Sequence, residues 1–162
     1  MSIVVSDASP VHYLILIGAV DVLPNLFSKV VIPKYILAEE LQNSKTPHPI
    51  RDWIRKLPNW VEIRKPSHPE ALGLQRGEED AISLALELNA PVLLDEREAR
   101  QVAEQKGLIV VGTVGIIERA AKKNLLDIQE AFAGLKKTNF RVSESLVDEA
   151  IRRHFRTMPP QT

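Results

Sequence analysis

The sequence contains no cysteine, carries no excess of either charge, and has no long uninterrupted hydrophobic run. Without cysteine there are no disulfides and no thiolate metal ligands, which is typical of intracellular proteins. Lysine plus arginine number 21, as do aspartate plus glutamate, so no overall basic charge points to nucleic acid by itself. The longest mostly apolar run, Val11 to Val20, is too short to cross a bilayer. No basic segment of a signal peptide is present, so we expect a cytoplasmic protein that does not bind membranes.

The length and composition are those of a small globular protein. A chain of 162 residues with 44% hydrophobic content is long enough to build one real core. We expect a single domain over residues 1–157 and a flexible C-terminal tail over residues 158–162.

Short apolar runs alternate with helical patterns along the chain. The expected strands are residues 3–6, 29–32, 60–63, 91–94 and 108–111. The expected helices are 10–20, 33–42, 50–57, 77–89, 97–106, one from 113, 127–136 and 143–153, with Ser9 and Thr113 as N-caps. Residues 64–76 are expected to be mostly loop, with a turn of helix at 70–74. This alternation predicts an α/β fold in which helices cover both faces of a parallel sheet.

Carboxylates follow two of the expected strands directly. Asp7 comes after the first strand, and Asp95 and Glu96 come after the fourth. The carboxyl ends of parallel strands share one edge of the sheet, where ligands and chemistry collect. If these two strands are neighbours, the three acids meet in the crevice between them.

Helical phase tests which other acids face the sheet, at about 100° per residue. In the helix 33–42, Glu40 falls between Ile36 and Leu37 on the apolar face. In the helix 77–89, Glu78 falls inside the apolar stripe and Asp80 falls at its edge. A carboxylate among apolar side chains is costly unless it is paired, hydrogen-bonded or bound to metal.

Four or five carboxylates in one crevice cannot all stay ionised without a cation. With oxygen ligands alone, such a site favours Mg²⁺ or Mn²⁺ over Zn²⁺. A metal of this kind can activate water and clamp the oxygens of a phosphodiester. The acids therefore predict a site for metal-assisted phosphodiester hydrolysis.

Five motifs occur in order along the chain. They are Ser6 to Pro10, Ile32 to Leu41, Gly77 to Ile82, Leu94 to Arg100, and Val111 to Gly115. Together, over roughly residues 3–153, they resemble the PIN-domain nucleases, in particular VapC-type toxins and a branch of bacterial and archaeal PIN-like proteins. The resemblance implies a three-layer α/β/α sandwich with a five-stranded parallel sheet of order 3-2-1-4-5, four clustered acids, Mg²⁺ or Mn²⁺, and single-stranded RNA as substrate. It also implies a cognate antitoxin and a homodimer.

Carried over to this sequence, the resemblance gives Asp7 as the first acid and Glu40 as the second. The third and fourth are either Glu78 with Glu96, 18 positions apart, or Asp80 with Asp95, 15 apart. Helical phase favours Glu78 over Asp80, and we retain both Asp95 and Glu96.

Simpler roles exist for several of these residues. Asp7 alone could cap the helix that follows it, and Glu78 could complement a helix dipole. Ser9, Asp80 and Thr113 are candidates for supporting contacts around the metal, although N-capping explains Ser9 and Thr113. Lys34, Arg97 and Arg100 are candidates for RNA phosphate contacts. The alternative for these three is pairing with surface glutamates.

The expected function is a metal-dependent endoribonuclease, a hydrolase of phosphodiester bonds, acting as the toxin of a type II toxin–antitoxin pair. The alternative is a catalytically weak PIN-like module that binds RNA or protein. The sequence lacks the phosphoacceptor pattern of receiver domains, the Asp-x-Asp of haloacid-dehalogenase phosphatases, and any phosphate-binding glycine loop.

Overall fold

Five short parallel strands form the centre of the molecule, described here from a computed structural model over residues 2–157. The strands are β1 (Ile3–Ser6), β2 (Lys29–Pro33), β3 (Val61–Arg64), β4 (Val92–Leu93) and β5 (Val110–Val111). Their order in the sheet is β3-β2-β1-β4-β5, so the order implied by the family resemblance is confirmed. Val4, Val5 and Val30 to Ile32 are fully buried, as expected for strands covered on both faces.

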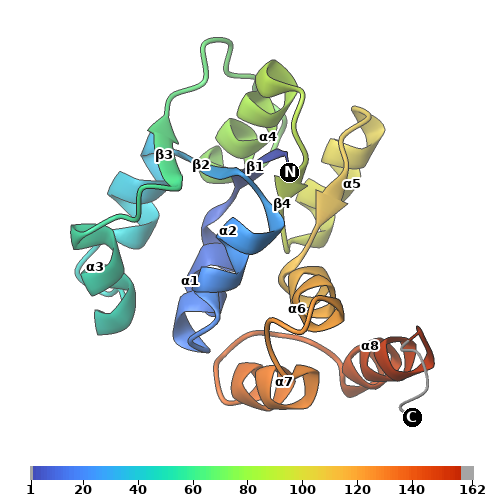
Figure 1. Cartoon of the computed structure of the whole chain (residues 1–162). Helices are drawn as coiled ribbons and strands as arrows, with labels where there is room; N and C mark the ends of the chain where they lie inside the picture. The colour runs from blue at the N-terminus through green and yellow to red at the C-terminus, as the bar shows by residue number, and fades with distance from the viewer. Residues whose placement is uncertain (1, 158–162) are drawn as a thin grey trace.

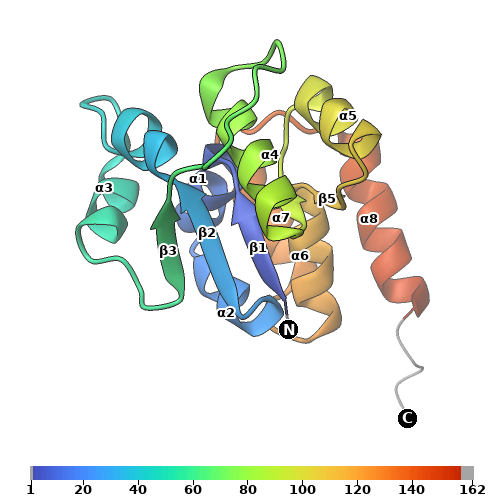
Figure 2. The same ribbon diagram turned by 90° about the horizontal axis from the view of Figure 1, so that it is seen from above.

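Helices cover both faces of this sheet (Figure 1). They are α1 (Ala8–Leu16), η1 (Val20–Val22), α2 (Leu23–Leu26), η2 (Ile36–Leu41), α3 (His48–Arg55), α4 (Arg76–Leu88), α5 (Arg97–Gln105), α6 (Thr113–Lys122), α7 (Ile128–Lys136) and α8 (Glu144–Thr157). Helix α1 packs against α3, η2 and α6 on one face, whereas α4 packs on β1, β2 and β4 from the other. Figure 2 shows α4 and α5 on the side of the sheet opposite α1 and α6. The fold is therefore a three-layer α/β/α sandwich.

This topology places the carboxyl ends of β1 and β4 next to each other at one edge of the sheet. Strand β1 lies between β2 and β4, pairing Val5 with Val31 on one side and with Val92 on the other. The chain leaves β1 toward β2 and leaves β4 toward β5, so the direction of winding reverses between β1 and β4. The crevice beyond their carboxyl ends is the switch point at which open α/β sheets place their ligand sites. Asp7 and Asp95 follow these two strands closely.

The first helix begins earlier than the sequence pattern predicts. It starts at Ala8 with Asp7 at the N-cap position, so the prediction of Ser9 as N-cap is wrong. It also ends at Leu16 rather than residue 20, because the backbone turns at Gly18 with φ of +72°. Only glycine adopts that conformation without a steric cost. Thr113 is likewise the first helical residue of α6, after Gly112 at the N-cap, rather than the cap itself.

The segment after β2 is a π-helix over Ile36–Leu41, where the pattern predicts an α-helix. The wider turn places Ile36 and Leu41, five positions apart, in the core together. Residues 70–74 form no helix, and α8 extends four residues beyond the predicted end at 153. The tail predicted over 158–162 lies outside the described residues. Among residues 2–157 no single helix has the length and hydropathy to span a membrane, although one pair bent by 116° (Ala8–Leu16 and Val20–Leu26) passes both criteria when the two helices are taken together.

Candidate active site

Asp7 lies at the carboxyl edge of the sheet, directly after β1 and before α1. Its backbone N–H donates to the carbonyl of Leu93, which fixes the end of β1 against β4 at 3.0 Å. Its side chain is 6% exposed and, despite its N-cap position, makes no capping hydrogen bond. Burial raises the pKa of Asp7 to about 7, the Ala8 backbone amide opposes the rise, and the carboxylates of Glu40, Glu78 and Asp95 add to it. Helix capping therefore does not explain this aspartate.

Asp95 lies across the crevice and is held by three hydrogen bonds. The Thr113 backbone N–H donates to Oδ1 at 2.7 Å, and the Thr113 hydroxyl donates to Oδ2 at 2.7 Å. The Ser9 hydroxyl donates to Oδ2 at 2.6 Å. Both residues predicted as helix caps thus orient an acid of the site, which fixes the Asp95 carboxylate between the first turns of α1 and α6.

Glu40 reaches the crevice from the π-helix η2. Its carboxylate lies over Gly77, so close that a Cβ at residue 77 would stand 2.7 Å from Glu40 Oε1. Burial raises the pKa of Glu40, and the neighbouring Glu78 raises it further. Gly77 therefore provides the space in which this carboxylate meets the first turn of α4.

Glu78 enters from α4. Its side chain accepts from the Gln75 backbone N–H at 3.3 Å, as half of a capping box. Burial raises the pKa of Glu78, the Gln75 hydrogen bond opposes the rise, and Glu96 leads the acids that add to it. Glu78, Glu96 and Glu98 line one pocket with Gln75. Glu96 itself is exposed, so it lies at the rim and Asp95 lies deeper.

These acids have no basic side chain that would neutralise their charge in the described part of the chain. Within residues 2–157, none of Asp7, Glu40, Glu78, Asp95 and Glu96 forms an ion pair with a basic side chain. A buried carboxylate with a raised pKa and acidic neighbours is the environment that a divalent cation relieves, and oxygen donors suit Mg²⁺ or Mn²⁺. The donor set therefore fits such a metal. In the described part of the chain, however, no three acidic or histidine side chains converge into a complete metal-binding cluster.

Asp80 does not join the other acids. Its side chain points to another pocket, lined by Lys34, Tyr35 and Lys65 among others, and forms an ion pair with Arg76 at 3.6 Å. The structure thus brings Glu78 rather than Asp80 into the neighbourhood of Asp7 and Glu40.

The three predicted phosphate contacts lie in different places. Arg100 lies beside Asp95, because its Nη1 and Asp95 Oδ1 both approach Gly112, at 2.9 and 3.1 Å from where a Cβ would stand. Arg97 is exposed in the first turn of α5, and Lys34 borders the pocket of Asp80. Among the described residues, none of the three forms an ion pair with a glutamate.

Two glycines belong to the site although the sequence analysis did not select them. Gly77 makes room for Glu40, and Gly112 makes room for Asp95 and Arg100. The sequence offers a clue at each position: a glycine directly before Glu78 inside a helix start, and another directly before Thr113. Glycine is unfavourable inside a helix, so its use in the first turn of α4 indicates a close approach.

The five-stranded sheet of order 3-2-1-4-5 with acids gathered at its carboxyl edge defines a PIN-like α/β domain. Residues 3–155 match the family model DUF3368, described as a PIN domain, and the chain therefore belongs to this PIN-domain family. Among solved structures, a PilT N-terminus domain protein from the hyperthermophilic archaeon Sulfolobus solfataricus is 18% identical, with 88% of this chain and 100% of that chain covered at a TM-score of 0.49. No curated protein matches the chain.

Proposed function

We propose that the protein is a Mg²⁺- or Mn²⁺-dependent endoribonuclease that cleaves single-stranded RNA. The observation that carries the proposal is the buried Asp7, surrounded by Glu40, Glu78 and Asp95 and without a basic partner in the described chain. Membership of a PIN-domain family supports the same chemistry. Asp7, Glu40, Glu78 and Asp95 would hold the metal, with Glu96 at the rim.

The cation, when bound, would supply an acidified water and draw charge from the scissile phosphodiester. The protein side chains prepare the site for both tasks. Ser9 and Thr113 hold the Asp95 carboxylate in one orientation. The carboxylate therefore does not have to reorient when the reaction occurs. Asp7, with a pKa of about 7, gives up its proton to accept the cation at neutral pH. Arg100, which approaches Gly112 from the same side as Asp95, would hold a phosphate oxygen of the substrate.

The proposal is tested with purified protein and a labelled single-stranded RNA, incubated with Mn²⁺ or with EDTA. We expect cleavage only with the metal, and loss of cleavage in Glu78→Gln. The matched control is Glu104→Gln, which removes the same charge from an exposed position on α5. Cleavage that persists in EDTA, or that Glu78→Gln leaves intact, would overturn the proposed site.

A second candidate is a PIN-like module that binds RNA or protein without cutting. The observation in its favour is that no three acids of the described chain converge into a complete metal cluster. Calorimetry with Mn²⁺ separates the two candidates, because the nuclease requires a Mn²⁺ site that Asp7→Asn abolishes. A protein that binds RNA but neither binds Mn²⁺ nor cuts is the module.

The toxin role and its partners belong to the same proposal. A toxin would be held by an antitoxin encoded beside it, and a homodimer is the expected assembly. Co-expression with a small neighbouring reading frame tests this role: we expect growth arrest by the protein alone, relief by the neighbour, and a stable complex on a sizing column. Growth that is unaffected by active protein would separate the nuclease from the toxin role.

A further inference from the structure

A second pocket, of about 290 Å³, lies on the other side of the first turn of α4. Its wall combines three kinds of group that the proposed reaction does not use. These are an aromatic ring (Tyr35), two lysines (Lys34, Lys65), and an ion pair (Arg76 with Asp80). Prolines 66 and 69 complete its apolar side.

Arg76 is held over the aromatic ring. Its guanidinium carbon lies 4.7 Å from the centre of the Tyr35 ring, a cation–π contact. Behind it, Asp80 Oδ2 lies 3.6 Å from Arg76 Nε, and the Asp80 side chain is only 6% exposed whereas that of Arg76 is 66% exposed. A buried carboxylate therefore positions a guanidinium that remains largely exposed to solvent.

The position of this pocket relative to the acids is fixed by the chain. Arg76 directly precedes Gly77, over which the Glu40 carboxylate lies. Tyr35 immediately precedes η2, the element that carries Glu40. The pocket and the acidic crevice thus share the wall formed by η2 and the first turn of α4. Strands β2 and β3, which end at Pro33 and Arg64, lead directly into the pocket.

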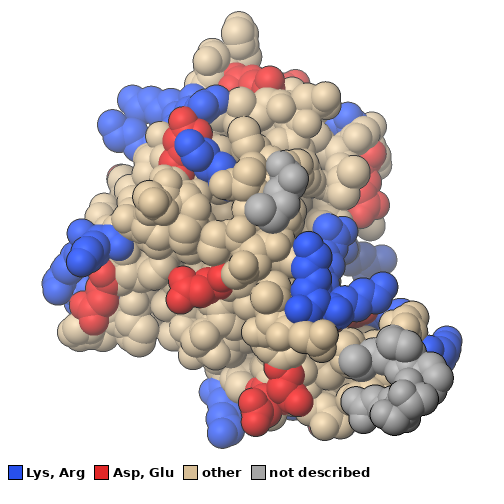
Figure 3. Space-filling view, viewed as in Figure 1, with Lys and Arg blue, Asp and Glu red and all other residues tan. Residues whose placement is uncertain are grey.

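The two flanks of the crevice differ in charge. On the α5 side the neighbouring pocket is lined by Glu78, Glu96 and Glu98, which repel phosphate. On the β3 side the pocket presents Lys34, Lys65 and Arg76 against Glu39 and Asp80. On the face that Figure 3 shows, basic and acidic side chains form separate groups rather than one continuous basic surface. The pocket on the β3 side therefore attracts phosphate more strongly than the glutamate-lined pocket on the α5 side, although α5 also carries Arg97 and Arg100.

We propose that this pocket binds one nucleotide of single-stranded RNA next to the scissile phosphate, with the base stacked on the Tyr35–Arg76 pair and the phosphate held by Lys34 and Lys65. The proposal rests on the nuclease function proposed above, and adds the subsite that positions its substrate. Unstacked RNA bases bind to aromatic rings and to guanidinium planes, and lysines beside them follow the backbone. Asp80 is a positioning residue that acts through Arg76.

The test measures binding of a fluorescent single-stranded RNA by anisotropy in EDTA, where no metal-dependent cleavage occurs. We expect Tyr35→Ala and Arg76→Gln to raise Kd about tenfold, because one base loses its stacking partner. Tyr35→Phe, which keeps the ring, stays within about twofold of the parent protein. Lys65→Gln lowers the slope of log K against log salt by about 0.7, the loss of one phosphate contact on a single strand.

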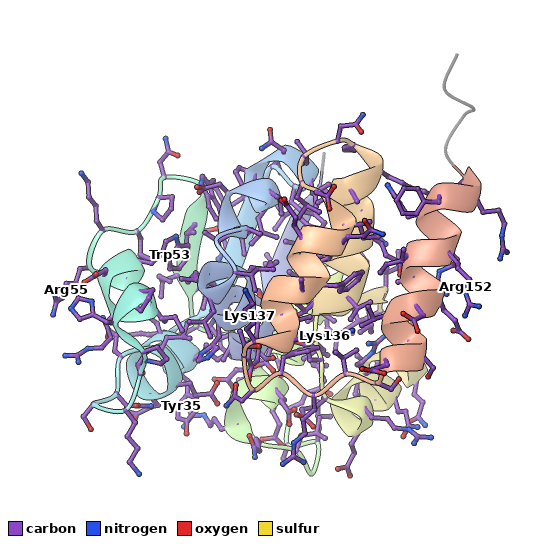
Figure 4. All side chains as sticks on the ribbon, turned by 90° about the horizontal axis from the view of Figure 1, so that it is seen from below. Tyr35, Trp53, Arg55, Lys136, Lys137 and Arg152 are labelled. Atoms are coloured by element: carbon purple, nitrogen blue, oxygen red, sulfur yellow. The ribbon has the colours of Figure 1, made fainter. Side chains whose placement is uncertain are left out.

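The matched control is Arg152→Gln on α8. Figure 4 shows Arg152 on the opposite side of the molecule from Tyr35. The Arg152→Gln variant removes the same charge as Arg76→Gln, and we expect it to change the Kd for RNA by less than twofold. Equal weakening by both arginine variants, equal binding by Tyr35→Ala and Tyr35→Phe, or no RNA binding by the parent protein would overturn the subsite. Melting temperatures confirm that each variant is folded.

A direct readout is photocrosslinking of RNA that carries 5-iodouridine, followed by peptide mapping. We expect the crosslink on the peptide containing Tyr35, and its loss in Arg76→Gln. Different results would contradict the proposed subsite and the proposed nuclease function. Unchanged binding in the pocket variants together with Mn²⁺-dependent cleavage overturns only the subsite. Pocket-dependent binding and crosslinking without cleavage overturns only the nuclease.

Discussion

Glu78 and Asp80 lie two positions apart on α4, on opposite sides of its first turn, and both are buried. Burial is the largest cause that raises the pKa of each. Their neighbours differ: Glu96 and Glu98 add to the raised pKa of Glu78, whereas Arg76 forms an ion pair with Asp80 and opposes the rise there. Burial of a carboxylate therefore does not identify a metal ligand by itself. The neighbouring charges differ, and they support placing Glu78 in the proposed metal site and Asp80 in the proposed RNA subsite.

The largest effect on the free energy of unfolding is expected for Asp7, whose carboxyl lies near Glu78 and has a strongly raised pKa. Its folded pKa of about 7 lies above the usual value of 3.8, so the folded protein binds this proton more tightly than the unfolded chain does. The free energy of unfolding in EDTA therefore falls as pH rises from about 4 to 7 and stays low above 7. Asp7→Asn removes this penalty, and we expect it to stabilise the protein by about 4 kcal/mol at pH 8 and by almost nothing at pH 4.

Urea denaturation at the two pH values measures this difference. Addition of Mn²⁺ should stabilise the parent protein and leave Asp7→Asn unchanged, because the variant has lost the central acid of the proposed metal site. A variant that is less stable at pH 8 than the parent would show that Asp7 supports the fold and would remove the contrast with Asp80.

The next largest effect is expected in catalysis, where substitutions of Glu78 and Asp80 should change different kinetic constants. Glu78→Gln should lower kcat by roughly a hundredfold, about 2.7 kcal/mol of transition-state stabilisation. Asp80→Asn should raise KM about threefold and leave kcat within about twofold, because it loosens Arg76 in the proposed RNA subsite without touching the crevice. Steady-state cleavage of one labelled RNA measures both variants. A fall in kcat for Asp80→Asn equal to that of Glu78→Gln contradicts the division into two surfaces.

The sequence predicts the sheet well because its strands are short, apolar and separated by helices. The position of each strand is correct to within two residues at either end. The errors lie at helix starts and in η2. Asp7 and Gly112 occupy N-cap positions without using a side chain, so a rule based on capping hydroxyls selects Ser9 and Thr113 instead. A period of about 3.6 residues cannot reveal a π-helix, which forms because Ile36 and Leu41 are both drawn into the core.

The sequence predicts the gathering of acids but not their contacts. Helical phase indicates that Glu40 and Glu78 face the sheet, and the structure places both near Asp7. Asp80 pairs with Arg76 four positions before it on α4, a spacing that the sequence shows but that the sequence analysis did not use. The hydrogen bonds from Ser9 and Thr113 to Asp95, by contrast, join residues far apart in the chain. Such contacts depend on the tertiary fold and leave no local pattern.

A smaller effect on the free energy of unfolding is expected for Thr113 and Ser9, whose hydroxyls hold the Asp95 carboxylate in place. Thr113→Val keeps the backbone donor to Asp95 and removes the hydroxyl, so we expect a loss of about 1–2 kcal/mol in the free energy of unfolding. Ser9→Ala should cost less, because Ser9 is only half-buried. Urea denaturation near neutral pH measures both. Stabilisation by Thr113→Val would show that the hydrogen bond from the Thr113 hydroxyl to Asp95 does not support the fold.

The smallest effect is expected for the stability of the Asp80 side. Burial raises the pKa of Asp80 despite the attraction of Arg76, so its charge brings no net stabilisation to the fold. Arg76 is largely exposed, and exposed pairs four positions apart on a helix contribute about 0.3–0.5 kcal/mol. Asp80→Asn should therefore change the free energy of unfolding at pH 7 by less than about 0.5 kcal/mol, and by less in high salt than in low salt, because salt screens an exposed pair. A loss above about 2 kcal/mol would make this pair a structural support, and weaker RNA binding by the variant would then no longer count for the subsite.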